Sequence, residues 1–516
     1  MKNHKIKGLL KRPISLFAFS AIVSLATMLL YNIPFFNYVV EHTNQSTGVR
    51  MFLMASLVVI MLLVNFMMTY LIMYLMRIVG RILLAILAII NATALYFIIT
   101  YNIIIDEITI GNVFNTRYSE ASGFFSWSLW AFIIAFGVLP GVICMLQPVV
   151  FEKAKKMGKY CGTSLAIVLA LIVANYNQLL WVGEHDTELG GLLQPWSYVV
   201  NSIRVTSIRM HKQAEEIKLP DGKITDNDKA VVVLVIGESA RKANFQLYGY
   251  KRANNPLLSK QQGLKVFQAT SCGTFTTAGV KAILEPKNSD DLYEPLPNYA
   301  FRTGADVVWR TTNWGEPPIH IDEYENDLKR APRYPNVDKK HDEILFAGLR
   351  ERIEQSPKNK VLIVIHTTTS HGPAYASKYP KKFEVYKPVA HNVEEGEKDP
   401  SKLVNAYDNS ILYTDYLLSN VIDTLRSMKE WKSSMIFISD HGESLGENNM
   451  FMHGIPMKLA PKVQYEIPFL VWTSDGFRDY KTNLPEVLEQ HYIFHSVLNL
   501  LSIQSPAYNK DFDIFK

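Results

Sequence analysis

The hydrophobic positions divide the chain into an apolar first third and a more polar remainder. Long apolar runs fall in the first third, near residues 14–36, 51–75, 80–102, 124–147 and 162–183. A helix needs about 20 such residues to cross a bilayer, so each run is long enough to span one. No small-residue cleavage site follows the first run, and further runs come after it, so we interpret it as a retained span. The pattern therefore predicts a five-helix transmembrane anchor domain over residues 1–183.

Basic residues set the orientation of the predicted anchor. The alternate loops carry acidic residues, and Lys and Arg are in excess on the cytoplasmic side of membrane proteins. This predicts a cytoplasmic N-terminus. An odd number of spans then puts the C-terminal part outside, which in a bacterial inner membrane means the periplasm. The basic positions are Lys2, Lys5, Lys7, Lys11, Arg12, Arg77, Arg81, Lys153, Lys155, Lys156 and Lys159, and the acidic ones are Glu41, Asp106, Glu107 and Glu120.

A polar linker is predicted over residues 184–229, with Pro220-Asp221-Gly222 as a turn signal. Its segment 196–210 mixes apolar and basic residues. Such a segment is typical of an amphipathic helix at the membrane interface, but a plain connecting helix fits the pattern as well.

Short β-branched apolar runs mark the rest of the chain, residues 230–516. Runs of this kind are typical of strands that are buried on both faces. Helical patterns alternate with them, over 341–355 and 405–428, and the charged stretch 391–402 predicts an exposed loop. The alternation predicts an α/β domain with a mostly parallel central sheet. The predicted strands lie at 231–236, 361–365, 435–438 and 468–472.

Charge and cysteine content exclude two classes of protein. The formal net charge is only +5 over 516 residues, with no concentrated basic face, so nucleic acid is not an expected partner. Cys144 and Cys161 lie in apolar segments, and Cys272 is alone in the C-terminal part. That part therefore cannot close an internal disulfide.

Polar residues follow the predicted strands at the ends where sites form in α/β sheets. Glu238, Asp440 and His441 would supply two carboxylates and one imidazole, a common zinc ligand set. His371 and His453 would bind a second metal ion or a phosphate, so the number of zinc ions is open between one and two. A lone His or Asp after a strand is more often a cap or a satisfied core polar group than a ligand.

A hydroxyl-rich loop lies at 271–277. Its residues are suited to capping a helix, or to supplying a nucleophile whose hydroxyl is activated by zinc and by a helix N-terminus. The spacing does not choose among Thr274, Thr276 and Thr277.

A polar stripe precedes the fourth apolar run. Asn112, Thr116 and Glu120 are spaced i, i+4 and i+8, so a helix would place them on one face. The spacing fits a solvated face and also a face that meets a lipid headgroup.

Four motifs together resemble a known family. They are Gly237-Glu238-Ser239-Ala240-Arg241 with Asn244 and Tyr248-Gly249-Tyr250; Ser271-Cys272-Gly273-Thr274-Phe275-Thr276; Ser370-His371-Gly372-Pro373; and Ser439-Asp440-His441-Gly442-Glu443-Ser444-Leu445-Gly446-Glu447 with His453-Gly454. With them, nearly the whole chain resembles the phosphoethanolamine transferases that modify lipid A and related envelope targets. This family includes the mobile colistin-resistance enzymes and belongs to the alkaline phosphatase–sulfatase superfamily.

The resemblance implies roles for individual residues. Thr276 matches the nucleophile, and with Glu238, Asp440 and His441 it matches the ligands of a catalytic zinc ion. His371, His453, Asn313 and Glu443 match substrate-binding or second-metal positions, and Asn112, Thr116 and Glu120 match positions that handle the lipid donor. The implied reaction moves the headgroup of phosphatidylethanolamine through a covalent threonine intermediate to lipid A, a core sugar or a protein.

The chain also departs from the family pattern. Ala282 stands where many members have a second cysteine, residues 279–281 replace the usual Ser-Val-Pro, and Pro317 replaces a phosphate-site lysine, whereas Asn313 is kept. The chain thus resembles a disulfide-free branch similar to the EptC-type enzymes. Related alternatives are a phosphoglycerol transferase, a sulfatase-like hydrolase, or a non-catalytic membrane receptor of the same fold.

Overall fold

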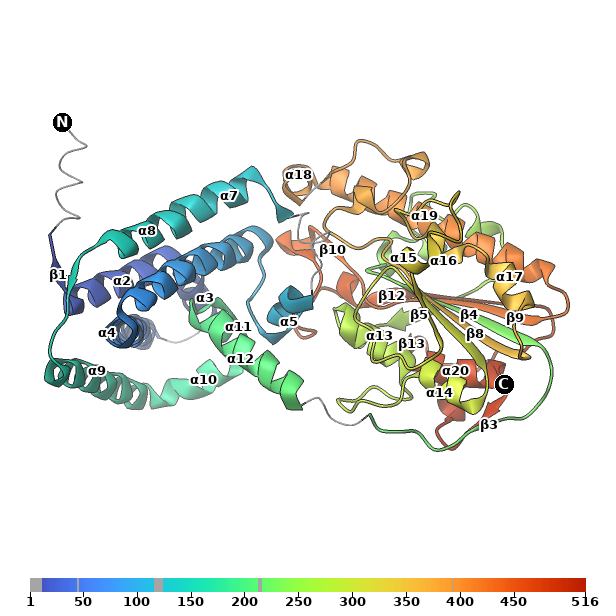
Figure 1. The fold of residues 1–516 in the computed structure, drawn as a ribbon, viewed down its shortest axis with the longest axis horizontal. Coiled ribbons are helices and arrows are strands. Elements are labelled where there is room, and N and C mark those ends of the chain that lie inside the picture. Colours follow the sequence, from blue (N-terminus) through green and yellow to red (C-terminus); the bar gives the residue numbers. More distant parts are fainter. Residues whose placement is uncertain (1–11, 44–45, 116–123, 212–215, 392) are drawn as a thin grey trace. The chain divides into compact units, whose positions relative to one another are not determined.

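The computed structural model describes residues 12–43, 46–115, 124–211, 216–391 and 393–516 (Figure 1). The chain divides into two compact units. The first contains residues 1–114 and 125–210, and the second contains residues 115–124 and 211–516.

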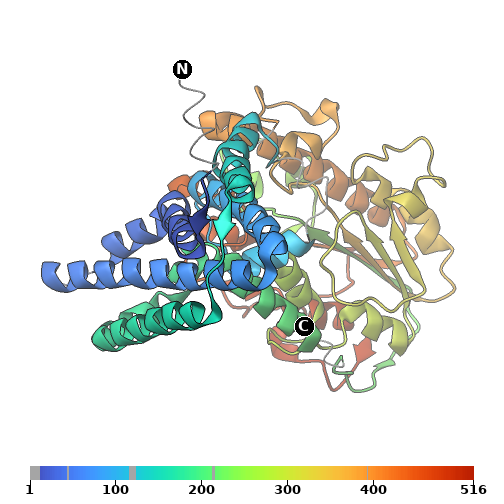
Figure 2. The ribbon, with the colours of Figure 1, turned by 60° about the vertical axis from the view of Figure 1, so that its left-hand side comes forward.

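The first unit is helical (blue to green in Figures 1 and 2). Only two-residue strands, β1 (Ile14–Ser15) and β2 (Val149–Val150), interrupt the helices among its described residues. The predicted helical segment at 196–210 is present as α12. The helices are α2 (Leu16–Tyr31), α3 (Ile33–His42), α4 (Thr47–Tyr101), α5 (Glu107–Asn115), α7 (Trp127–Ile133), a π-helical segment (Ile134–Val138), α8 (Leu139–Leu146), α9 (Ala154–Ala174), α10 (Leu179–Glu184), α11 (Asp186–Leu192) and α12 (Trp196–His211).

The helices of this unit do not confirm the five predicted spans one by one. Within the described residues, 3 helices are long and apolar enough to cross a bilayer, or up to 4 if the bent pair α2 and α3 counts as one span. The difference arises at α4, which covers the second and third predicted spans in one element of 55 residues. It contains one non-helical residue, Arg77, with φ 47° and ψ −107°.

The first predicted span bends at its outer end. Helices α2 and α3 meet at an angle of 60° around Asn32. Pro34 lies in the first turn of α3, where a missing N–H is tolerated but where the preceding helix cannot continue. The Asn32 side chain donates to the Gln194 carbonyl oxygen at 3.0 Å and accepts from the Gln194 N–H at 2.8 Å. The bend is therefore tied to a segment distant in the sequence.

The second unit is built on an eight-stranded sheet in the order β13-β5-β12-β9-β4-β8-β6-β7. The four predicted strands are present as β4, β8, β9 and β12. The bounds are β4 (Ala230–Gly237), β5 (Lys265–Thr270), β6 (Asp306–Thr311), β7 (Glu323–Asn326), β8 (Lys360–His366), β9 (Lys432–Ser439), β12 (Glu466–Thr473) and β13 (Val487–Glu489).

The sheet is mixed, but it is mostly parallel as expected, with one strand that runs against the others. Strand β12 runs antiparallel to both of its neighbours, β5 and β9, whereas the other neighbouring pairs are parallel. The apolar run of β12 reads like that of a parallel strand because it too is buried on both faces. Burial on both faces sets the sequence pattern, and strand direction leaves no mark on it.

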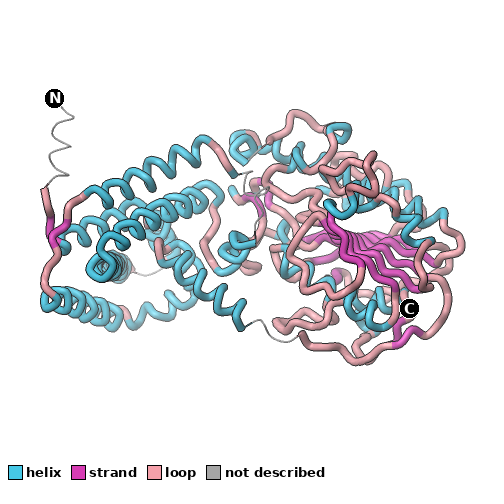
Figure 3. Tube along the Cα trace, in the orientation of Figure 1, coloured by secondary structure: helices cyan, strands magenta, loops and turns pink. Residues whose placement is uncertain are grey.

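Helices cover both faces of this sheet (Figure 3). Successive residues of β4 enter two different cores: Val232, Leu234 and Ile236 pack on one face, and Val231 and Val233 on the other. The first core includes α13 (Thr276–Leu284), α14 (Leu296–Thr303) and α20 (Tyr492–Leu500), and the second includes α19 (Pro400–Ser427).

Local predictions in this unit needed further correction. The helical pattern at 341–355 is divided into α16 (Glu343–Phe346) and α17 (Leu349–Glu354) by Gly348, whose φ is +61°. The stretch expected to be a loop at 391–402 contains α18 (Val393–Lys398) and the start of α19. The pattern at 405–428 is helical, but α19 begins earlier, at Pro400, which suits the first turn of a helix.

Candidate metal centre

Strand register brings the two candidate carboxylates together. The central strands β4 and β9 are parallel neighbours, and Gly237 is paired with Ser439 at their carboxyl ends. Glu238 and Asp440 are the next residues on each strand, and both are fully buried. Their proximity is therefore a direct consequence of the sheet pairing.

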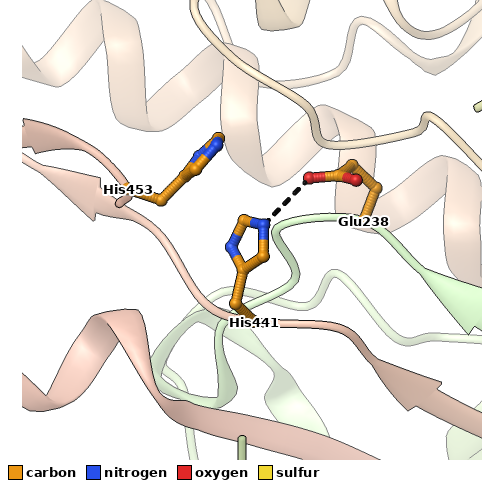
Figure 4. Close-up of side chains that lie close together, drawn as sticks. All are labelled: Glu238, His441 and His453. Carbon is orange, nitrogen blue, oxygen red and sulfur yellow. Dashed lines mark ion pairs between the residues drawn. The ribbon is translucent and has the colours of Figure 1, made fainter. Parts of the chain in front are cut away.

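His441 completes a compact cluster with these carboxylates. Its Nε2 atom lies 3.3 Å from Oε1 of Glu238 and 3.4 Å from Oδ2 of Asp440. Figure 4 shows the His441 ring pointing toward the Glu238 carboxylate, with His453 on the opposite side. Ligand atoms of Glu238, His441 and His453 lie within 4.8 Å of one another, as do those of Glu238, His366 and Asp440.

The donor set of this cluster fits a divalent cation. The Nδ1 atom of His441 lies 2.8 Å from the Gly442 carbonyl oxygen, which can only accept, so Nδ1 carries a proton and Nε2 is the atom that would coordinate a metal ion. Asp440 Oδ1 accepts from the N–H groups of His441 and Ser239, but its buried Oδ2 has no hydrogen-bond partner among the described residues. A buried carboxylate oxygen without a donor is explained by a metal ion.

Electrostatics support the same interpretation. Burial and the neighbouring Glu238 carboxylate raise the pKa of Asp440 well above its usual value. Burial alone would raise the pKa of Glu238, but His371, His441 and His453 hold that pKa well below its usual value. Burial lowers the pKa of His441, but the two carboxylates outweigh it and raise that pKa to about 10. Two buried carboxylates this close repel each other, and a cation relieves the repulsion.

Among the three candidate threonines, Thr276 faces this cluster. Its Oγ1 atom donates to Oε2 of Glu238 at 3.3 Å and lies 3.4 Å from Nε2 of His441. Thr274 instead donates its hydroxyl to the Ile455 carbonyl oxygen at 2.6 Å. Thr276 is also the first residue of α13, where the backbone N–H groups lack intrahelical acceptors and favour an anion.

Close backbone packing fixes the turn that carries Asp440. A Cβ atom at Gly279 of α13 would lie 2.0 Å from the Asp440 carbonyl oxygen. Gly442 is required for a similar steric reason, since a Cβ there would lie 2.0 Å from the Val463 carbonyl oxygen. The side-chain amide of Gln490 donates to the carbonyl oxygens of Ser439 and Asp440, at 3.0 and 2.7 Å.

The Gly279→Ala substitution is expected to displace this turn. A backbone oxygen cannot move aside as a side chain can, so overpacking of about 1–3 kcal/mol is expected, together with weaker metal binding. Differential scanning calorimetry and zinc titration of the full chain would measure both effects. Gly190→Ala in α11 is the control, because no atom lies within 4 Å of a Cβ at that helical position. Equal behaviour of the two variants would contradict the steric role of Gly279.

Histidines expected on the substrate side lie beside the cluster. The rings of His441 and His453 are 4.3 Å apart, and those of His371 and His453 are 5.5 Å apart. Nδ1 of His453 donates to Oε2 of Glu443 at 2.8 Å, and Oε1 of Glu443 accepts from the Tyr375 hydroxyl at 2.8 Å. In this arrangement the fully buried Glu443 orients His453.

His366 is a site residue that the sequence reasoning did not select. It ends strand β8, and its Nε2 lies 3.1 Å from Nδ2 of Asn313, which donates to Oε2 of Glu238 at 2.7 Å. Its Nδ1 lies 3.6 Å from Oε2 of Glu316. The sequence could have indicated His366, because this residue ends one of the predicted buried strands. Gln490 offered no comparable signal.

The predicted lipid-donor stripe is only partly described. Asn112 lies in α5, whereas Thr116 and Glu120 fall outside the described residues. The cysteine prediction is confirmed, since Cys144, Cys161 and Cys272 are all free.

Comparison with known proteins finds similar proteins over nearly the whole chain. The family model "Sulfatase" matches residues 230–503, and the model "Phosphoethanolamine transferase EptA/EptB" matches residues 60–210. The phosphoethanolamine transferase EptA of Helicobacter pylori is 35% identical, over 98% of this chain and 97% of its own length. EptA of Escherichia coli K12 is 28% identical over 99% of this chain and 98% of its own.

Solved structures give the same result for the fold. The integral membrane phosphoethanolamine transferase EptA of Neisseria meningitidis superimposes with a TM-score of 0.86 and 25% identity, covering 98% of this chain and 99% of that chain. The periplasmic domain of EptC from Campylobacter jejuni matches with a TM-score of 0.51 and 28% identity, covering 58% of this chain and 97% of that domain. The chain therefore belongs to the phosphoethanolamine transferase family, with a C-terminal domain of the sulfatase family.

Proposed function

We propose that the chain is a zinc-dependent enzyme that transfers phosphoethanolamine from phosphatidylethanolamine to lipid A or a related envelope acceptor. The observation that carries the proposal is the position of Thr276 Oγ1, within 3.4 Å of both Glu238 and His441 at the start of α13. Relatives that carry the names phosphoethanolamine transferase EptA and Kdo(2)-lipid A phosphoethanolamine 7''-transferase support the donor and acceptor classes.

The proposed reaction is a double displacement. The Oγ1 of Thr276 forms a bond to the donor phosphorus, the bond to the diacylglycerol oxygen breaks, and phosphoethanolamine stays on the threonine. An acceptor oxygen then attacks the same phosphorus and releases Thr276. A zinc ion held by Glu238, Thr276, Asp440 and His441 would lower the pKa of the threonine hydroxyl.

The chain's own side chains position the reactants and move the protons. Glu238 accepts the hydrogen bond of the Thr276 hydroxyl and so holds its proton before attack. The N–H groups that begin α13 stabilise negative charge on the phosphoryl oxygens. His453, oriented by Glu443, is the imidazole we assign to protonate the leaving diacylglycerol oxygen, and His371 completes the substrate side or a second zinc site.

We propose that α4 crosses the membrane twice, which gives five crossings in all. A Cβ at Gly80 would lie 2.8 Å from the Ile72 carbonyl oxygen, although eight residues of straight helix rise by about 12 Å. The chain therefore bends sharply between them, at Arg77. The full 55 residues would otherwise extend about 80 Å, far more than the ~30 Å of a bilayer core.

Five crossings and the basic loops support a cytoplasmic N-terminus and a periplasmic catalytic domain at the bacterial inner membrane. The proposed division is an anchor over 1–183, a linker over 184–229 and a catalytic domain over 230–516. Anchoring raises the local concentration of lipid substrates, and Asn112, Thr116 and Glu120 are the proposed contacts to the donor.

Donor choice tests this function. The full-length protein in vesicles would be offered phosphatidylethanolamine or phosphatidylglycerol with labelled headgroups, with and without lipid A. Label on the protein from phosphatidylethanolamine, and its transfer to lipid A, is the expected result. Label from phosphatidylglycerol would indicate a phosphoglycerol transferase. Release of the free headgroup without transfer would indicate a hydrolase. A protein that shows no turnover and binds no zinc would be a receptor.

Zinc binding is expected to release protons at neutral pH. The pKa of His441 is raised to about 10 without metal, so its imidazole is protonated at neutral pH, and coordination through Nε2 must displace that proton. Zinc binding therefore releases protons, and the affinity for zinc rises with pH. Calorimetry in buffers of different ionisation enthalpy would measure the number of protons released; a value of zero would contradict it.

A further inference from the structure

We propose that a groove in the membrane-spanning unit binds one acyl chain of a membrane phospholipid. The groove is a cavity of about 460 Å³ lined by α2, both parts of α4, the π-helical segment and α8. This volume lies within the range of about 300–1,000 Å³ typical of small-molecule sites. The inference is independent of the transfer reaction proposed above.

The length of the groove matches one leaflet of a bilayer. Its lining positions on α2 run from Phe19 to Tyr31 at spacings of one, three and four residues, which keeps them on one face of the helix. These 12 steps of helix rise about 18 Å, and half of a ~30 Å bilayer core is about 15 Å. A single extended acyl chain has this length.

Rigid packing keeps one wall of the groove in place. A Cβ at Gly137 would lie 2.9 Å from the Cα of Ile89, and one at Gly141 would lie 3.3 Å from the Cα of Ala85. The π-helical segment and α8 therefore touch the backbone of the second part of α4 directly. A wall fixed by backbone contact cannot collapse to fill the space.

Chemistry along the groove identifies its occupant. Most of the lining is apolar, while Thr69 and Gln147 bring polar groups to the end where α2 begins. At the other end, the Tyr31 hydroxyl already donates to the Phe136 carbonyl oxygen, and Asn91 already accepts from the Tyr198 hydroxyl. At this depth water is scarce, and an empty apolar space would forfeit the dispersion contacts of its walls. Hydrocarbon is the material that the bilayer supplies in quantity. The polar end suits the ester group that joins an acyl chain to glycerol.

Thr69 adds an independent observation. It lines the groove from the first part of α4 and is 1% exposed. Its Oγ1 atom has no hydrogen-bond partner among the residues that the structure describes. A buried hydroxyl without an acceptor is costly in a membrane interior, and an ester oxygen of a bound lipid would accept its hydrogen bond.

Photo-crosslinking tests the proposal on the full-length protein. Vesicles of phosphatidylethanolamine and phosphatidylglycerol would carry a phospholipid with a diazirine in the middle of one acyl chain. After irradiation, mass spectrometry of peptides is expected to show label concentrated on α2 and α8 above the level at Val173, which lies outside the groove on α9 and is 74% exposed. Label at or below the Val173 level would overturn the proposal.

A matched pair of variants locates the bound chain. Ala135 lines the groove, whereas Ala131, one helical turn earlier, does not, and both are exposed. Ala135→Phe is expected to fill the groove and reduce the α2 label to the Val173 level, and Ala131→Phe is expected to leave it unchanged. Equal labelling in the two variants would contradict binding in the groove, whatever their effect on transfer.

Discussion

Replacing Thr276 by alanine is expected to abolish the covalent phosphoethanolamine adduct and to lower the transfer rate by at least about 10⁴-fold. Its Oγ1 is the hydroxyl that the structure places within 3.4 Å of both Glu238 and His441. Intact-mass measurement of the full-length protein after exposure to phosphatidylethanolamine, followed by peptide mapping, would detect the adduct. If Thr276 had only a structural role in α13, its replacement would leave the adduct in place and would lower the transfer rate far less.

The neighbouring threonines provide the controls. Thr274→Ala removes a hydrogen bond to the Ile455 carbonyl oxygen, so a loss of stability is expected while the adduct still forms. Thr277→Ala, in the first turn of α13, is expected to retain both adduct and activity. If the adduct survives in Thr276→Ala but disappears in either control, the nucleophile is another threonine, and the proposed mechanism is wrong.

Replacing Asp440 by asparagine is expected to remove the stabilisation that zinc gives to the protein. Zinc at about 1,000 times its dissociation constant would stabilise the wild type by about 4 kcal/mol, or roughly 10 °C in Tm for a domain of this size. Asparagine keeps an oxygen for the N–H groups of His441 and Ser239, but its amide cannot serve as the charged ligand. The variant should therefore melt at the same temperature with zinc as with a chelator, and transfer activity should be lost.

Without zinc, Asp440→Asn is expected to have the opposite effect on the stability of the protein, which makes the test sharper. Burial and Glu238 raise the pKa of Asp440, which means that the ionised carboxylate is unfavourable there without a cation. In chelator, Asp440→Asn is therefore expected to be at least as stable as the wild type. Asp415→Asn is the control, because this buried carboxylate accepts from the N–H groups of Leu257 and Leu258 outside the site. It should keep the full zinc-induced increase in stability.

Local patterns were sufficient for the central elements of the fold. The β-branched runs of β4, β8, β9 and β12 are buried on both faces, and continuous burial leaves a pattern that is readable without a partner strand. Four strands of the sheet were missed. Strands β5 and β7 are partly exposed and rich in polar residues, β13 has only 3 residues, and β6 is buried but has a short apolar run between polar residues. The break between the second and third apolar runs was predicted and lies at Arg77, whereas the interruption at Gly348 was missed because a single unusual φ barely alters hydrophobic periodicity.

The sequence by itself determined the membrane-spanning character of the first third, the central strands and the candidate ligands Glu238, Asp440 and His441. Composition and the ends of apolar runs carry that information because burial is a property of each segment. Tertiary structure decided which threonine faces the cluster, the direction of β12 and the presence of His366 beside Glu238. Each of these depends on distances between residues far apart in the chain, which only the packing of sheet and helices sets.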